Sequence, residues 1–170
     1  MSEAVPTGAF VPDTVAALWC HPVYTLPLPD GHPFPIHKYR YLNAFLRRMG
    51  YPSLMAPLCL RTCLHLAHAE AYLDGLYRGS LPDRERRRLG FQDGPLWLHR
   101  DRTGCGGTIA ALHSALQLGA SAHLGGGTHH ASRNRGGGFC LLNDVAVATL
   151  WALDLGISPL LLVDLDAHYP

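Results

Sequence analysis

The stretch "SPLLLVDLDAH" at residues 158–168 restricts the fold more than any other part of the chain. Leu160 to Val163 are four consecutive apolar residues, and Leu165 continues the run past Asp164. A strand that is apolar on both faces must be covered on both faces, and parallel sheets with helices on each side provide that cover. The segment therefore predicts a buried strand within an α/β fold that has a parallel sheet and flanking helices.

Four amphipathic segments supply the helices that such a sheet needs. Apolar residues recur at helical spacing from Ile36 to Met49, and Gly50 follows as a stop signal. The remaining helices are expected at 64–77, at 108–118, and from a cap at Asn143 or Asp144 to Gly156.

The segments between these helices have different patterns. The proline-rich stretch 27–35 excludes regular helix, because each proline lacks an amide donor. The charged stretch 82–91 is interpreted as a solvated face or loop, and "SAHL" at 121–124 as a short strand. Residues 1–20 are expected to form a loose lead-in.

The composition limits the class of protein and its partners. The chain has 170 residues, of which 48% are hydrophobic and 16% charged, so it can form one domain with a core. A net charge of +1 gives no broad field for binding nucleic acid or an anionic membrane.

The cysteines and the apolar runs indicate where the protein resides. Five cysteines are scattered without a C-x-x-C pair, which favours a reducing compartment over a disulfide framework. The N-terminus lacks a secretory signal pattern, and no apolar run reaches the ~18–20 residues of a membrane span. We therefore expect a soluble intracellular protein, in the cytoplasm, the nucleus or both.

The sharpest candidate for chemistry is Asp164-x-Asp166-x-His168. Open parallel sheets bind ligands beyond the carboxyl ends of their strands. A period of two directs these three side chains to the same side while the strand continues. Buried carboxylates and imidazoles must be paired or bind a cation, and these donors suit zinc or another divalent transition metal. The alternative is that the strand has ended and the three residues lie in a solvated turn.

A second candidate is the pair His129–His130, which stands between the glycine triplets 125–127 and 136–138. Two adjacent imidazoles that act together need irregular backbone, and glycine permits positive φ and close approach of the backbone to a ligand. General acid–base catalysis is the usual role of such histidines. The alternative is a solvated glycine-rich loop that holds histidines by chance.

Two further sites are weaker. A phosphate cradle is disfavoured, because the chain lacks both a Walker lysine and a G-x-G-x-x-G motif at the glycine triplets. His65 and His68 are three residues apart on a predicted helix and could bind metal, but we interpret them as structural because no third ligand is evident nearby.

Several motifs, in the expected order, resemble the zinc-dependent histone deacetylase family of the arginase/deacetylase superfamily, particularly its class IV and bacterial-type members. They are "PLPDGHPFPIHKY", "HAEAYL", "GGTIAAL", "GGGTHHASRNRGGGFCLLNDVAVA" and "LLLVDLDAH". The resemblance runs from about Tyr24 to His168. It implies the arginase–deacetylase fold, with residues 21–170 as the N-terminal portion of the domain, truncated after the Asp-x-Asp-x-His motif.

The resemblance also implies roles for individual residues. Asp166 and His168 correspond to two of the three protein ligands of a catalytic Zn²⁺. Asp164 corresponds to the carboxylate beneath the first catalytic histidine, which also helps to hold a structural K⁺. The tandem His129 and His130 correspond to the general base and acid around the attacking water. The wall of the narrow acyl-lysine tunnel corresponds to Gly138 and Phe139.

The implied reaction is removal of acetyl or longer acyl groups from lysine side chains of proteins or peptides. Zinc polarises the amide carbonyl and lowers the pKa of its water. One histidine takes the proton of that water, and a histidine later protonates the leaving amine. A carboxylate hydrogen-bonded to His129 sets the tautomer of that histidine.

The sequence departs from the family pattern in two respects. Family members continue past the position of Pro170 with the third zinc ligand, an aspartate, and with the tyrosine that stabilises the oxyanion. Pro33 stands where many relatives have an arginine, which argues against an inner-channel role at this position. We therefore expect these 170 residues alone to be catalytically incomplete. A non-catalytic interaction or regulatory fragment and an acetylpolyamine-type amidohydrolase remain the alternatives.

Overall fold

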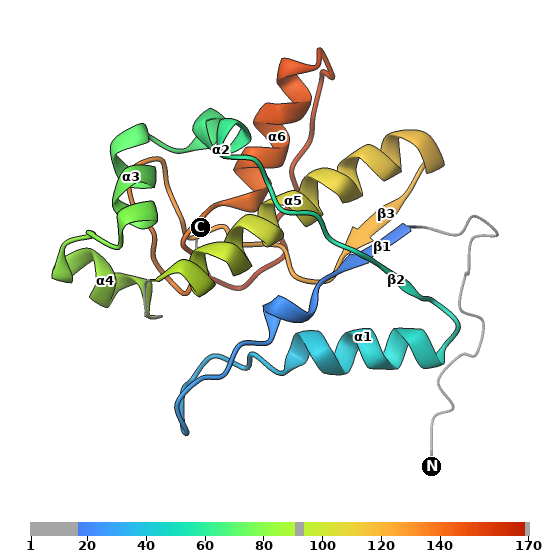
Figure 1. The fold of residues 1–170 in the computed structure, drawn as a ribbon. Helices are drawn as coiled ribbons and strands as arrows, with labels where there is room; N and C mark the ends of the chain where they lie inside the picture. The colour runs from blue at the N-terminus through green and yellow to red at the C-terminus, as the bar shows by residue number, and fades with distance from the viewer. Residues whose placement is uncertain (1–16, 91–93, 169–170) are drawn as a thin grey trace.

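The described residues form a three-stranded parallel sheet (Figure 1). The computed structural model describes residues 17–90 and 94–168. Strand β1 (Ala17–Cys20) lies between β2 (Ser53–Met55) and β3 (Ser121–His123), and both pairs are parallel. The predicted α/β class and the strand at "SAHL" are therefore confirmed.

The central strand β1 lies within the segment 1–20 that the sequence predicts as a loose lead-in. That boundary is wrong for residues 17–20, because the partners that order this strand lie far along the chain, at Ser53 and Ser121. The first 16 residues of the predicted lead-in lie outside the described residues.

Helices pack against the sheet and against one another. The longest, α5 (Pro95–Leu118), contacts β1, β3 and α6 (Asp144–Asp154), and crosses the middle of the molecule in Figure 1. The other helical segments are η1 (Pro22–Tyr24, a 3₁₀ turn), α1 (Lys38–Arg48), α2 (Arg61–Ala67), α3 (Glu70–Arg78) and α4 (Asp83–Leu89). Fully buried core side chains include those of Leu64, Leu73, Leu89, Leu141, Leu142 and Val147. Across residues 17–90 and 94–168, we find no helix with the length and apolar character needed to cross a bilayer.

Two predicted helices have nearly their expected bounds. Helix α1 ends just before Gly50, which has a positive φ of 88°. Helix α6 begins after the N-cap Asn143, whose side chain accepts the amide proton of Ala146 at 2.9 Å. Caps and stops act within one helical turn, so local sequence reveals them. The charged stretch at 82–91 contains the short, largely solvated helix α4.

The helix predicted over 64–77 is instead two helices that meet at His68. The backbone of His68 is extended, so α2 ends before it and α3 begins two residues later. Its Nδ1 lies 3.1 Å from the carbonyl oxygen of Ser132, and its Nε2 accepts the amide proton of Asn143 at 3.0 Å. These partners from a distant loop account for the break, and they confirm that His68 has a structural role.

Helix α5 begins at Pro95 rather than at the predicted Thr108. Glycines near its middle argue against helix in the sequence, because glycine lowers helix propensity. Yet a Cβ at Gly106 would lie 2.0 Å from the carbonyl oxygen of Pro57, and one at Gly107 would lie 2.3 Å from Nε2 of His123. Close tertiary packing requires these glycines and overrides their low propensity.

The apolar run at 160–165 is not the buried strand that it predicts. Residues 157–166 have no regular secondary structure, and the residues Leu161, Val163 and Leu165 are 87%, 69% and 91% exposed. A strand needs a neighbour to satisfy its backbone groups and cover its faces. In the described part of the chain the sheet ends at β3, and no strand pairs with this segment.

Candidate active site

The candidate catalytic side chains surround one cavity of about 490 Å³. Its lining includes six of the seven residues predicted from the sequence, namely His129, His130, Gly138, Phe139, Asp166 and His168. The seventh, Asp164, contacts His129. Residues that are up to 39 positions apart (129 to 168) therefore meet at one place, as the sequence predicts.

The carboxylate of Asp164 supports the ring of His129. The Nδ1 atom of His129 lies 2.6 Å from Oδ2 of Asp164, and the side chain of His129 is only 12% exposed. Hydrogen bonds from His129 and from the amide of Asp166 hold the pKa of Asp164 below its usual value. An ionised carboxylate at Nδ1 keeps the proton on that nitrogen and leaves Nε2 free to accept another.

The second histidine lies beside the first. The ring centroid of His130 is 4.2 Å from that of His129 and 5.9 Å from that of His168. The backbone before the pair turns tightly, since the amide of His129 donates to the carbonyl oxygen of Gly127 at 3.0 Å. This irregular backbone lets two adjacent imidazoles line the same cavity, as expected.

Asp166 and His168 form a compact pair at the cavity. The carboxylate oxygen Oδ1 of Asp166 accepts from the amide of His168 at 2.7 Å and lies 2.7 Å from Nδ1 of the same residue. These hydrogen bonds lower the pKa of Asp166. The three residues of the Asp-x-Asp-x-His motif are thus arranged by local side-chain-to-backbone bonds, rather than by the continuing strand that the sequence predicts.

The ligand types of this pair suit zinc, but their number does not. A carboxylate oxygen and an imidazole nitrogen are ordinary zinc ligands, and both lie at the cavity near His130. A catalytic zinc takes three protein ligands. Within residues 17–90 and 94–168, no three His, Cys, Asp or Glu side chains converge on one point. Asp166 and His168 therefore fit as two ligands of an incomplete set.

An aromatic wall lines the same cavity as the histidines. Phe139 has a positive φ of 67°, and its ring centroid lies 5.2 Å from that of Phe34 and 5.6 Å from that of His32. Gly138 allows close approach, because a Cβ there would lie 2.4 Å from Cδ2 of His130. The predicted wall residues therefore lie on the cavity, and Pro33 lines it as well.

Sequence reasoning missed several residues that line the cavity, among them Phe34, Lys38, Tyr39 and Arg100. Arg100 is 3% exposed and pairs with Asp101 at 2.6 Å, and its Nη2 donates to the hydroxyl of Tyr39 at 3.3 Å. In the sequence, "HRDR" at 99–102 has the pattern of a solvated helix face. Its burial could have been inferred only if the helix had been predicted to begin before these residues rather than at Thr108.

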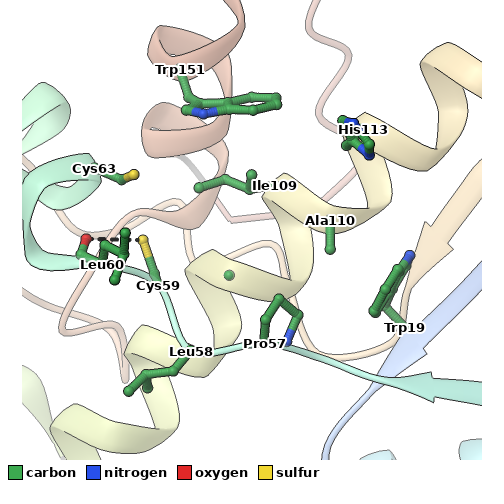
Figure 2. Close-up of a pocket in the computed structure, with 11 residues that line it drawn as sticks. Trp19, Pro57, Leu58, Cys59, Leu60, Cys63, Ile109, Ala110, His113 and Trp151 are labelled. Atoms are coloured by element: carbon green, nitrogen blue, oxygen red, sulfur yellow. Dashed lines mark hydrogen bonds between the residues drawn. The ribbon is translucent and has the colours of Figure 1, made fainter.

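A second cavity, of about 300 Å³, lies apart from these residues between β1, the start of α2, α5 and α6 (Figure 2). Trp19 and Trp151 belong to its largely apolar lining, together with the thiols of Cys59 and Cys63. Burial, and then Cys63, raise the pKa of the Cys59 thiol to about 12. That thiol therefore stays protonated at neutral pH and is a poor nucleophile.

The chain matches a known domain over most of its length. Residues 32–169 fit the family model of the histone deacetylase domain. The chain belongs to the histone deacetylase family. The arrangement of its sheet and helices is part of the arginase–deacetylase fold.

Related family members are known from several organisms. The chain is 37% identical over 153 residues to an uncharacterized protein of Picosynechococcus sp., covering 87% of this chain and 51% of the relative. It is 32% identical over 148 residues to Histone deacetylase 2 of Arabidopsis thaliana, covering 81% of this chain and 38% of that protein. The chain thus spans about half or less of these relatives.

Solved structures agree on the fold. An HDAC homolog complexed with SAHA superposes with a TM-score of 0.69 at 25% identity, over 83% of this chain and 42% of that one. The HDAC homolog from Aquifex aeolicus gives a TM-score of 0.68 at 24% identity, over 84% and 42%.

Proposed function

We propose that this chain supplies the tandem-histidine part of the active site of a zinc-dependent deacetylase that hydrolyses acetylated or longer acylated lysine side chains of proteins or peptides. Membership of the histone deacetylase family supports a deacetylase hydrolase in general terms. The observation that carries the proposal is the 2.6 Å contact between Asp164 and His129, beside His130 and the Asp166–His168 pair in one cavity.

Asp166 and His168 are the proposed zinc ligands, and Asp164 additionally contributes to a structural K⁺ site. When bound, zinc would polarise the amide carbonyl and lower the pKa of its water. Because two ligands hold zinc poorly, the proposal requires a third ligand and an oxyanion donor from beyond the residues that the structure describes. The activity of the whole protein is therefore part of the proposal.

The two histidines divide the proton transfers. Nε2 of His129 takes the proton of the attacking water, because the Asp164 carboxylate keeps Nδ1 protonated and stabilises the imidazolium that forms. His130, whose ring lies 4.2 Å away, serves as the general acid that protonates the leaving lysine amine. The mostly buried position of His129 limits competition from bulk water.

The aromatic wall binds the substrate stem. The ring of Phe139, braced by Phe34 and His32, offers an apolar face to the methylene groups of an acyl-lysine. Gly138 leaves room for the ring of His130 beside this wall, because a Cβ at that position would overlap the ring. A flexible, uncharged acyl-lysine chain fits such a wall better than a bulky or highly charged substrate does.

Residence in the cytoplasm or the nucleus is part of the same proposal. All five cysteines of the chain are free, as in proteins of reducing compartments. The net charge of +1 gives no support for direct binding to nucleic acid or to an anionic membrane.

Metal content and turnover test the proposal together. Zinc retained after dialysis should fall in Asp166→Ala and His168→Ala but not in Asp154→Ala, a control at the end of α6. The protein that contains this chain and the rest of the domain should cleave acetyl-lysine peptides, lose that activity to a chelator, and regain it with Zn²⁺. Equal zinc in all variants would contradict the ligand assignment. Preference for acetylpolyamines would favour the amidohydrolase alternative, and zinc-bound protein without turnover a non-catalytic role.

A further inference from the structure

Beneath the His129–His130 turn runs a chain of polar side chains that the proposed reaction does not use. The hydroxyl of Tyr24 lies 2.7 Å from Nε2 of His123, and Nδ1 of His123 lies 2.9 Å from Oγ1 of Thr108. The hydroxyl of Thr108 in turn donates to Oδ2 of Asp144. Four elements, η1, β3, α5 and α6, each contribute one member.

Each hydroxyl has only one proton to donate, and this fixes the direction of the hydrogen bonds along the polar chain. Thr108 gives its proton to Asp144, so its Oγ1 can only accept from His123, which must therefore carry a proton on Nδ1. Burial lowers the pKa of His123 to about 4, so the ring is neutral at pH 7 and its Nε2 is an acceptor. The hydroxyl of Tyr24 also lies 3.1 Å from the carbonyl oxygen of Thr103, but its contact with His123 is the shorter one.

The polar chain of hydrogen-bonded side chains ends at the backbone segment that carries His129 and His130. The carboxylate of Asp144 accepts from the amides of Gly127 and Thr128 at 3.1 and 2.7 Å and from the hydroxyl of Thr128 at 2.6 Å. The hydroxyl oxygen of Thr128 accepts the amide proton of Asp144 at 3.1 Å in return. Residues 127 and 128 directly precede His129. The hydrogen bonds to Asp144 therefore fix the position of the backbone that leads into the histidine pair.

Three glycines pack closely against members of this polar chain. A Cβ at Gly107 would lie 2.3 Å from Nε2 of His123. A Cβ at Gly125 would lie 2.4 Å from the ring of Tyr24, and one at Gly126 would lie 2.5 Å from Oδ2 of Asp144. Of the first glycine triplet, Gly127 alone has positive φ. The glycine triplet 125–127 is typical of a backbone that approaches a ligand closely, whereas Gly125 and Gly126 make room for members of this polar chain.

We propose that His123 is a positioning residue which, as its Nδ1–H tautomer, orders Thr108 and Asp144 and thereby holds the turn at 127–128 that presents His129 and His130 to the cavity. His123 does not touch the substrate. The effect of this positioning on catalysis rests on the proposed deacetylase function. The ordering of the turn does not, because it is a property of the folded polypeptide.

Nuclear magnetic resonance on the 170-residue chain tests the tautomer and the coupling. The ¹⁵N shifts of His123 should identify a neutral ring protonated at Nδ1. In Thr108→Val, amide hydrogen exchange at residues 127 and 128 should accelerate at least about tenfold, because the carboxylate that holds both amides loses its anchor. Thr108→Ser keeps the hydroxyl and should restore the exchange rates of the wild type.

A matched control lies on the same helix. Thr103 is 1% exposed, and its hydroxyl donates to the carbonyl oxygen of His99 at 2.8 Å. Thr103→Val therefore removes a buried hydroxyl that is not a member of the polar chain, and it keeps the backbone carbonyl that lies beside Tyr24. A His123 ring protonated at Nε2 would overturn the proposal. So would equal exchange at residues 127 and 128 in Thr108→Val and Thr103→Val.

Kinetics of the complete enzyme separate this inference from the proposed function. There, Thr108→Val should lower kcat about tenfold or more with KM nearly unchanged, and Thr108→Ser should recover it. Accelerated exchange in an enzyme with normal kcat would overturn the catalytic part. A protein without deacetylase activity in the wild type would contradict the proposed function, while the tautomer and exchange results would still decide the ordering of the turn.

Discussion

The imidazole of His68 accepts the amide proton of Asn143 at 3.0 Å, although 75 positions separate the two residues. Asn143 caps α6, and its side-chain amide donates to the carbonyl oxygens of His129 and Ala131 at 3.3 and 2.9 Å. The backbone on both sides of His130 is therefore fixed by a residue that His68 itself holds. A buried histidine that does not line the cavity thus helps to place the candidate catalytic pair.

Replacement of His68 by leucine is expected to lower the free energy of unfolding by about 1–3 kcal/mol, because the Asn143 amide loses its partner while it stays partly buried. Urea unfolding measures this change. His65→Leu, within α2 just before His68, is the control, with an expected change below about 1 kcal/mol. Equal losses in the two variants would show that the contact with Asn143 contributes nothing specific.

Stability is expected to fall as the pH drops below about 6.5. Burial lowers the pKa of His68, and it lowers that of His123 to about 4. Between about pH 6.5 and 4 the unfolded chain therefore binds more protons than the folded chain, so the free energy of unfolding decreases with decreasing pH. For His123 the whole interval corresponds to about 3 kcal/mol.

Urea titrations at several pH values in this interval measure the slope. His123→Asn removes one titrating group and should flatten the dependence, whereas His37→Asn, an exposed histidine, should not. A slope that is the same in all three proteins would contradict the lowered pKa of His123.

Gly126→Ala is expected to destabilise the chain by about 1–3 kcal/mol, because the new methyl group would overlap the buried carboxylate of Asp144. Gly104→Ala serves as the comparison. The nearest atom to a Cβ at Gly104 is 4.0 Å away, and alanine favours helix, so stability should stay equal or rise by up to about 1 kcal/mol. Thermal unfolding of both variants separates the two effects, and a neutral Gly126→Ala would mean that the polar chain can move aside.

Asp164→Asn is expected to lower kcat of the complete enzyme about 10²–10⁴-fold with little change in KM. The amide can still bind Nδ1 of His129, but it removes the charge that stabilises the protonated ring. Steady-state kinetics with an acetyl-lysine peptide measure the effect, with Asp154→Asn as the control. Unchanged kcat in Asp164→Asn would exclude His129 as a base supported by this carboxylate.

The parts of the fold that the sequence predicts correctly depend on local signals. The cap at Asn143 and the stop at Gly50 act within a turn of their own helices. The sequence predicts that the histidine pair and the Asp-x-Asp-x-His motif come together, because each lies at or beyond the end of a segment interpreted as a strand. Both do lie at one cavity, although only "SAHL" proves to contain a strand.

The errors have non-local causes. The helix over 64–77 breaks because His68 has partners in a loop more than 60 positions away, at Ser132 and Asn143. Helix α5 extends through its glycines because Pro57 and His123 approach too closely for any side chain. Residues 160–165 do not form a strand because a strand needs a neighbouring strand to pair with. The apolar pattern of one segment does not indicate whether such a neighbour is present.

Phe139 is the one non-glycine residue with positive φ in the described part of the chain. For an aromatic side chain that conformation costs about 1–3 kcal/mol. Its amide donates to the carbonyl oxygen of Leu89 at 2.8 Å, which holds the backbone in place. Glycine there would relax the backbone and remove the ring that faces the cavity. Selection for a more stable fold therefore favours glycine at position 139, whereas selection for tighter binding of an aliphatic chain favours phenylalanine.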